Sequence, residues 1–193
     1  FSASEGKALQ VYQDAGTGET TVTIKDCDFV AAKQAATWDG KPVTGIDINS
    51  NGAIFNVYVE NCTTTGFPVG LNSGSDLYNI KNGGLAYTYL TVDGVVVNRP
   101  GFTKLANYPN IWVKDNNYYV FDKDGLAELN TYFRENWCSN GVWNHEYHIG
   151  ADIDAEGLTW NSVWVNVGDN GLDGLVFDGD NHTISNLNIN GSL

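Results

Sequence analysis

The chain contains three pairs of closely spaced carboxylates, a spacing that could support acid–base chemistry or metal binding. They are Asp152 and Asp154, Asp169 and Asp173, and Asp178 and Asp180. Neighbouring carboxylates can act as general acid and base, and oxygen-rich turns bind calcium. Because Asp is also a usual turn residue and each pair lies close to Gly or Asn, a structural role competes with both. We expect no catalysis from these pairs. We expect no cofactor, and calcium is the one alternative left open. Its candidate ligands are Asp152, Asp154, Asp169 and Asp173.

The segment His145-Glu146-Tyr147-His148 places two histidines three residues apart. The zinc-protease pattern His-Glu-x-x-His needs a spacing of four on a helix, which brings both imidazoles to one face. A structural zinc site also needs three or four ligands that converge. The sequence therefore does not favour zinc at this segment.

Aromatic residues offer a second kind of chemistry, because exposed rings stack on sugar faces while acidic neighbours accept hydrogen bonds from sugar hydroxyls. The alternative is that these rings fill the core. The candidate ligand-binding residues are Trp112, Trp143, Trp160 and Trp164.

Charge and composition narrow the class of partner. With 10 basic and 23 acidic residues, the formal net charge is −13, whereas nucleic acid and anionic lipid need a basic surface. We expect neither as a partner. No run of 18 apolar residues is present, so we expect no membrane insertion. Three cysteines without a CxxC pair argue against a disulfide framework and a thiolate zinc site.

The elements that would position these side chains are indicated by residues 174–189. Val176, Ile184, Leu187 and Ile189 recur at strand-like intervals around the turn residues Asp178 to Asn181. One such coil cannot bury its apolar face alone, so it predicts a solenoid of stacked coils.

An internal repeat supports the solenoid. Val22-x-Ile24-x-x-Cys27 returns 35 residues later as Val57-x-Val59-x-x-Cys62, and Leu90-Thr91-Val92 follows 33 residues after Val57. Equal spacing allows like strands to stack in register. We therefore expect Cys27 over Cys62, as small buried residues, and Asp26 over Asn61.

A helix is predicted over residues 123–136. Asp122 can cap its N-terminus, and Leu126, Leu129 and Phe133 share one face. We expect it to cap coils, because a cap covers unpaired strand edges. The expected organisation is β-helix coils over 1–97, a junction over 98–117, and a cap strand and helix followed by further coils over 118–193. The two sets of coils would stack, within one chain or head to tail between chains.

The coils and the segment Phe-Asp-Gly-Asp-Asn-His-Thr-Ile-Ser-Asn-Leu resemble the right-handed parallel β-helix (pectin-lyase-like) proteins that gut bacteria secrete or display. This resemblance implies an all-β fold with one short capping helix. It also implies a structural role for His182, as a hydrogen-bonding residue at the corner, and a secreted or cell-surface location, the leader being absent from this sequence. The resemblance concerns the repeated coils and not an active site. The chain has two arginines, Arg99 and Arg134, and neither matches the Arg-x-Pro-x-x-Arg pattern of the family's lyases.

Together these features predict a non-catalytic, adhesin-like binding module for glycans or a cell-surface polymer. The alternative is a fragment of a polysaccharide lyase or glycoside hydrolase of the same fold.

Overall fold

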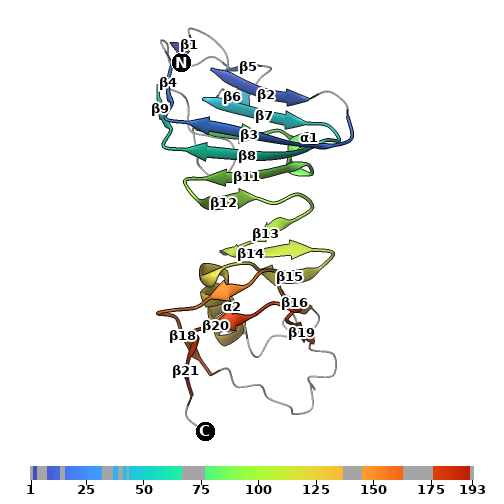
Figure 1. Ribbon diagram of the computed structural model, residues 1–193, viewed down its shortest axis with the longest axis vertical. Coiled ribbons are helices and arrows are strands. Elements are labelled where there is room, and N and C mark those ends of the chain that lie inside the picture. The colour runs from blue at the N-terminus through green and yellow to red at the C-terminus, as the bar shows by residue number, and fades with distance from the viewer. Residues whose placement is uncertain are drawn as a thin grey trace. The chain divides into compact units, whose positions relative to one another are not determined.

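In a computed structural model, the chain consists mainly of strands, and the structure describes residues 2–3, 8–13, 16–31, 37–38, 41–42, 44–66, 77–136, 145–162 and 176–191. It divides into two compact units, Phe1–Gly101 and Phe102–Leu193. Each sheet among these residues lies within one unit. In both units, parallel pairing of successive coils forms a β-solenoid, which confirms the predicted fold class (Figure 1).

The first unit contains three stacked coils. The first coil is β2 (Leu9–Gln13), β3 (Glu19–Lys25) and β4 (Asp28–Ala31), the second is β7 (Ile46–Ser50), β8 (Ile54–Glu60) and β9 (Thr63–Thr65), and the third contains β10 (Tyr78–Ile80), α1 (Asn82–Leu85) and β11 (Thr88–Val92). Like strands pair in parallel across the coils. Two short pieces complete the unit: β1 (Ser2–Ala3) pairs with β4, and β5 (Thr37–Trp38) pairs with β6 (Lys41–Pro42).

The register of this stack matches the sequence repeat. Val22 pairs with Val57, and Val57 pairs with Leu90, so residues of the same type lie one above another. Since side chains alternate along a strand, this row points inward and packs in an aliphatic core with Ile46 and Ile48.

The first unit ends in a hairpin. Asp93 and Gly94 have φ values of 46° and 80°, the conformation of a two-residue turn that fits the twist of paired strands. The chain then returns as β12 (Val95–Asn98), antiparallel to β11.

The second unit begins with strands where the sequence indicated a junction. Much of 98–117 forms β13 (Thr103–Leu105) and β14 (Tyr108–Lys114), antiparallel to each other, and β14 pairs with β15 (Asn117–Val120). Pro109 is accommodated near the start of β14, beside a register shift.

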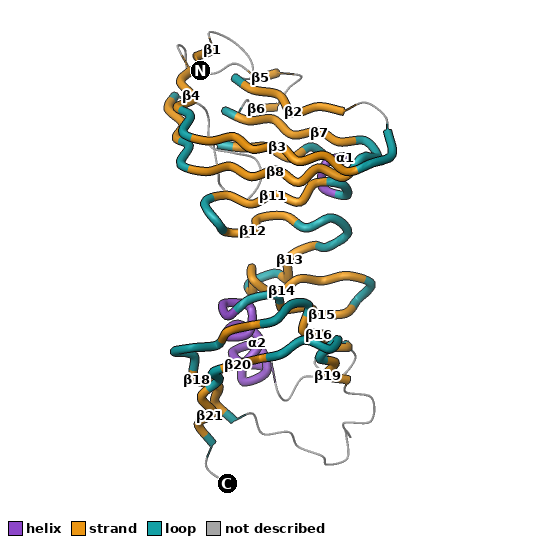
Figure 2. Tube along the Cα trace, viewed as in Figure 1, coloured by secondary structure: helices purple, strands orange, loops and turns teal. Residues whose placement is uncertain are grey.

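The predicted helix is present with the predicted bounds, α2 (Lys123–Asn136). The Gly125 amide donates to Asp122 Oδ1 at 2.8 Å, which caps the first turn. The helix leads to two coils: β16 (Glu146–Ile149), β17 (Ile153–Asp154) and β18 (Thr159–Asn161), then β19 (Val176–Asp178), β20 (Ile184–Ser185) and β21 (Asn188–Asn190), paired in parallel. The helix packs against β16 and β18, because the Phe133 ring contacts Tyr147 and Trp160 (Figure 2).

A second helix among the described residues, α1, was not predicted. It has four residues, Asn-Gly-Gly-Leu, which carry little helical signal. A Cβ on Gly84 would lie 3.0 Å from Ile80 Cγ2 and 3.2 Å from the Ile48 carbonyl oxygen. The close approach of the chain to β7 therefore selects this short helix, and the expectation of a single helix was wrong.

Candidate functional site

One row of side chains on the second unit comes from three neighbouring strands. Tyr119 of β15 pairs with His148 of β16, and His148 pairs with Asp178 of β19. The adjacent row consists of Tyr118, Tyr147 and Phe177. Its first two rings, Tyr118 and Tyr147, are buried and belong to the core. Because successive residues face opposite sides of a strand, Tyr119, His148 and Asp178 lie on the outer side.

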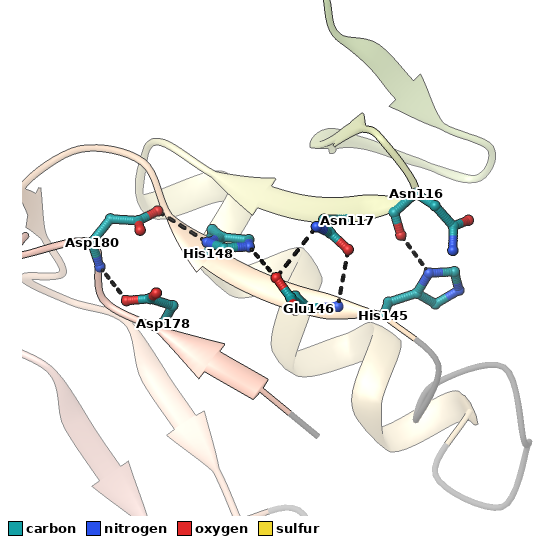
Figure 3. Close-up of polar contacts among 7 residues, drawn as sticks. All are labelled: Asn116, Asn117, His145, Glu146, His148, Asp178 and Asp180. Carbon is teal, nitrogen blue, oxygen red and sulfur yellow. Dashed lines mark hydrogen bonds and ion pairs between the residues drawn. The ribbon is translucent and has the colours of Figure 1, made fainter. Parts of the chain in front are cut away.

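The corner after β19 brings a second carboxylate to the same place. The Asp180 amide donates to Asp178 Oδ1 at 2.8 Å, and Asp180 and Asn181 both have left-handed backbone conformations, with φ values of 47° and 64°. Asp and Asn tolerate this conformation better than other non-glycine residues. The turn places Asp180 Oδ2 3.0 Å from His148 Nδ1 (Figure 3).

Glu146 faces the other nitrogen of the same ring. Its Oε2 lies 3.5 Å from His148 Nε2, which is buried and has no hydrogen-bond partner among the described residues. Asn117 fixes Glu146, since the Glu146 amide donates to Asn117 Oδ1 at 3.3 Å and Asn117 Nδ2 lies 3.4 Å from Glu146 Oε2. The Tyr119 ring stacks on His148 with centroids 4.5 Å apart. The imidazole, 11% exposed, is thus fixed on three sides.

The surroundings of this imidazole are electronegative. The pKa of the Tyr119 hydroxyl is raised, first by burial and then by the carboxylates of Asp180, Asp115 and Glu146. In the described part of the chain, no lysine or arginine forms an ion pair with Glu146, Asp178 or Asp180. The site therefore suits a cation.

His148, Asp178 and Asp180 offer one ligand atom each, and these atoms lie within 4.8 Å of one another. The sequence had directed attention to His145 as the partner of His148. Instead, the His145 ring stacks on Tyr118, with centroids 4.3 Å apart, and its Nδ1 lies 2.6 Å from the Asn116 carbonyl oxygen. The two aspartates grouped with His148 are 30 and 32 residues away in sequence. This separation is close to one coil, and it is the signal that could have found them.

The carboxylates predicted to bind calcium have structural contacts where they are described. Asp152 Oδ1 accepts a hydrogen bond from the Thr183 amide at 2.9 Å and lies 3.2 Å from His182 Nδ1. Asp154 Oδ1 accepts hydrogen bonds from the Glu156 amide and from Asn186 Nδ2. The contacts with Thr183, His182 and Asn186 link the two coils. Asp169 and Asp173 lie outside the described residues.

The predicted aromatic residues are not gathered into one site where they are described. Trp112 is 3% exposed, and Lys104 Nζ lies 5.0 Å from its ring centroid. Trp160 is half-buried and packs against Phe133, with centroids 6.4 Å apart. Trp143 and Trp164 lie outside the described residues. Both described tryptophans contribute packing.

In the first unit, the residues given a structural role form a ladder at a corner. Asn61 Nδ2 donates to Asp26 Oδ1 at 2.7 Å, and the Asn61 amide donates to Asp93 Oδ1 at 2.7 Å. All three have left-handed backbones, with φ between 46° and 53°. Cys27 and Cys62 follow at the same corner as free, partly buried thiols packed on the core, and burial raises the pKa of the Cys62 thiol.

The sequence did not point to a group of side chains on the outer sheet face of the first unit. Tyr58 of β8, 36% exposed, lies between Thr23 of β3 and Thr91 of β11. In the next row, Asn56 lies beside Tyr89, and the Arg99 guanidinium stands 5.3 Å from the Tyr89 ring centroid. Alternation along each strand could have grouped these residues, but only the pairing of β8 with β11 sets the two tyrosines on adjacent strands.

Comparison of this chain with protein-family models, curated proteins and solved structures gave no match. Within the described residues, no helix is both long enough and apolar enough to cross a membrane.

Proposed function

We propose that this chain is a non-catalytic, surface-displayed or secreted binding module that holds a neutral polysaccharide against the outer face of β3, β8 and β11. The observation that supports this proposal is the exposed Tyr58 ring between two threonines of neighbouring strands. A sugar ring presents an apolar face and a rim of hydroxyls, so a tyrosine beside hydrogen-bonding groups complements both.

The side chains around Tyr58 extend the same chemistry. Asn56 and Thr91 can donate to and accept from sugar hydroxyls, and Tyr89 supplies a second ring on the adjacent strand. The strands of a parallel sheet lie about 4.8 Å apart, so a chain of sugars can extend across several strands. These groups are placed on regular strands, which fixes their spacing before a ligand arrives.

Charge favours a neutral polymer over an acidic one. On this face Lys25 Nζ pairs with Glu60 Oε2 at 2.9 Å, and Glu19 accepts a hydrogen bond from Asn56 Nδ2. The lysine is therefore engaged, and the chain as a whole carries a formal charge of −13. Arg99, against the Tyr89 ring, adds a positive charge at this face. The acidic charge of the whole chain nevertheless disfavours a polyanion.

The test is binding of the chain to a glycan array and to insoluble neutral polysaccharides, with Tyr58→Ala as the main variant. We expect wild-type binding at high micromolar to millimolar affinity and loss of most of it in Tyr58→Ala. Tyr12→Ala is the matched control, because Tyr12 is also an exposed tyrosine, 51% exposed, but belongs to β2 in another sheet.

Three results would overturn the proposal. The first is absence of binding to any neutral glycan, and the second is an equal loss in Tyr12→Ala and Tyr58→Ala. The third is release of shortened or unsaturated oligosaccharides from a bound polymer, which would favour the lyase or hydrolase alternative.

A further inference from the structure

We propose that His148, Asp178 and Asp180 form a binding site for a divalent transition metal ion of the zinc class. This site lies on the second unit and does not depend on the proposed glycan face. It is also different from the calcium site that the sequence indicated at Asp152 and Asp154.

The three ligand atoms are brought together by the coil stack. His148 and Asp178 pair across β16 and β19, and the left-handed turn after β19 directs Asp180 back to His148 Nδ1 at 3.0 Å. Ligands of one tetrahedral zinc ion lie about 3.4 Å apart, given bonds of about 2.0–2.2 Å. The widest spacing here is at most 4.8 Å. Rotation of the exposed Asp178 side chain can close the difference.

Glu146 faces the imidazole on the side away from the proposed ion. It faces Nε2, whereas both aspartates lie on the Nδ1 side (Figure 3). A proton kept on Nε2 and directed to Glu146 leaves the Nδ1 lone pair for the ion. This carboxylate-to-histidine arrangement commonly orients histidine ligands of metals. Metal ligands bind in their deprotonated forms, so any proton carried by a ligand atom passes to solvent when the ion binds.

The donor set favours a transition metal over calcium. Calcium takes six to eight oxygen ligands, whereas the site offers two carboxylates and an imidazole. Imidazole nitrogen suits zinc, nickel and copper, and a fourth position is open to water. With three carboxylates beside one imidazole and no paired lysine or arginine in the described part of the chain, an ion of charge +2 also neutralises the local field.

The experiment titrates the full chain, first treated with a chelator, with Zn²⁺ by calorimetry and with Co²⁺ by absorption spectroscopy. We expect one tight equivalent and a cobalt spectrum of nitrogen and oxygen ligation. Asp180→Asn and His148→Gln should each weaken affinity at least about tenfold. Asn tolerates the left-handed conformation at position 180, so Asp180→Asn should fold, and its circular dichroism and melting temperature check this.

His182→Ala is the matched control. His182 Nδ1 lies 3.2 Å from Asp152 Oδ1 in the same unit, but it is not part of the three-ligand group. We expect this variant to bind the metal as the wild type does. Absence of a tight equivalent would overturn the proposal, as would unchanged affinity in Asp180→Asn and His148→Gln, or equal loss in His182→Ala. A cobalt-thiolate charge-transfer band would assign the ion to cysteine instead and overturn the proposal too.

Discussion

The two units stack coils of similar length but fill their interiors differently. In the first unit, aliphatic side chains such as Ile48, Val57 and Leu90 form inward rows. In the second unit, an aromatic cluster lies between α2 and the strands. It consists of Tyr132 and Phe133 of α2, Tyr118 of β15 and Tyr147 of β16. Coils in register leave a narrow interior that branched residues fill. A helix packed against a sheet leaves a wider, irregular space, which large rings occupy.

The corners, in contrast, are built alike in the two units. Asn61 donates to Asp26 across one pair of coils, and Asn186 donates to Asp154 across another. Both asparagines have left-handed backbones, with φ values of 48° and 55°. Different cores thus share one way to turn a corner, because the turn needs a residue that tolerates positive φ and can bond to the next coil.

The largest effect is expected from Tyr147→Ala. Tyr147 is fully buried and contacts Tyr118, Tyr132 and Phe133, so its loss should reduce the free energy of unfolding by about 3–5 kcal/mol. Hydrogen exchange should show lost protection in residues 102–193. Tyr147→Phe, which keeps the ring, should lose only about 0.5–1.5 kcal/mol. Equal loss of protection in both units would contradict the separation of the two cores.

Glycine-to-alanine substitutions in the two helices should have a smaller effect on stability, and the effect should differ between α2 and α1. A Cβ on Gly125 of α2 would lie 2.7 Å from the Asn110 carbonyl oxygen, so Gly125→Ala should destabilise by about 1–3 kcal/mol. The sign is opposite to helix propensity, which favours Ala by about 1 kcal/mol. Gly84→Ala in α1, with looser contacts, should cost less. Chemical denaturation measures both, and Thr131→Ala on the exposed face of α2 is the control expected to be nearly neutral.

The corner comparison predicts matched effects of Asn61→Ala and Asn186→Ala. Each should destabilise by about 1–2 kcal/mol, because Ala in a left-handed conformation is strained. Asn61→Gly and Asn186→Gly should recover most of this loss, since glycine adopts the conformation freely. Thermal unfolding monitored by circular dichroism is the measurement. Failure of glycine to recover stability at either site would show that the hydrogen bond to Asp dominates there.

The smallest effect is expected on the stability of the fold at low pH. The Thr183 amide and His182 hold the pKa of Asp152 below its ordinary value of 3.8, and Asn186 and the Glu156 amide do the same for Asp154. Both groups bind fewer protons in the folded state, so their contribution is complete above about pH 4 and is lost as pH falls below it. Melting temperatures of wild type should decrease more steeply over this range than those of the double variant D152N/D154N. Parallel curves would contradict this assignment.

The sequence by itself determined the coil repeat and the capping helix. Val22, Val57 and Leu90 share a pattern at nearly constant spacing, and strands of that kind bury their apolar side only by stacking. Asp122 and the face of Leu126, Leu129 and Phe133 likewise set α2, because a cap and an apolar stripe act within a few residues of the chain. Local periodicity in the sequence was therefore sufficient to predict the fold class.

Tertiary structure decided which residues meet at the two candidate binding sites. His148 lies with Asp178 and Asp180, not with His145, because strand pairing between successive coils sets neighbours about 30 residues apart. The same pairing sets Tyr58 beside Thr23 and Thr91, and packing places Trp112 in the interior. A spacing of about one coil suggests such neighbours but does not fix them, since loops of different length join the strands and the burial of both cores fixes the register.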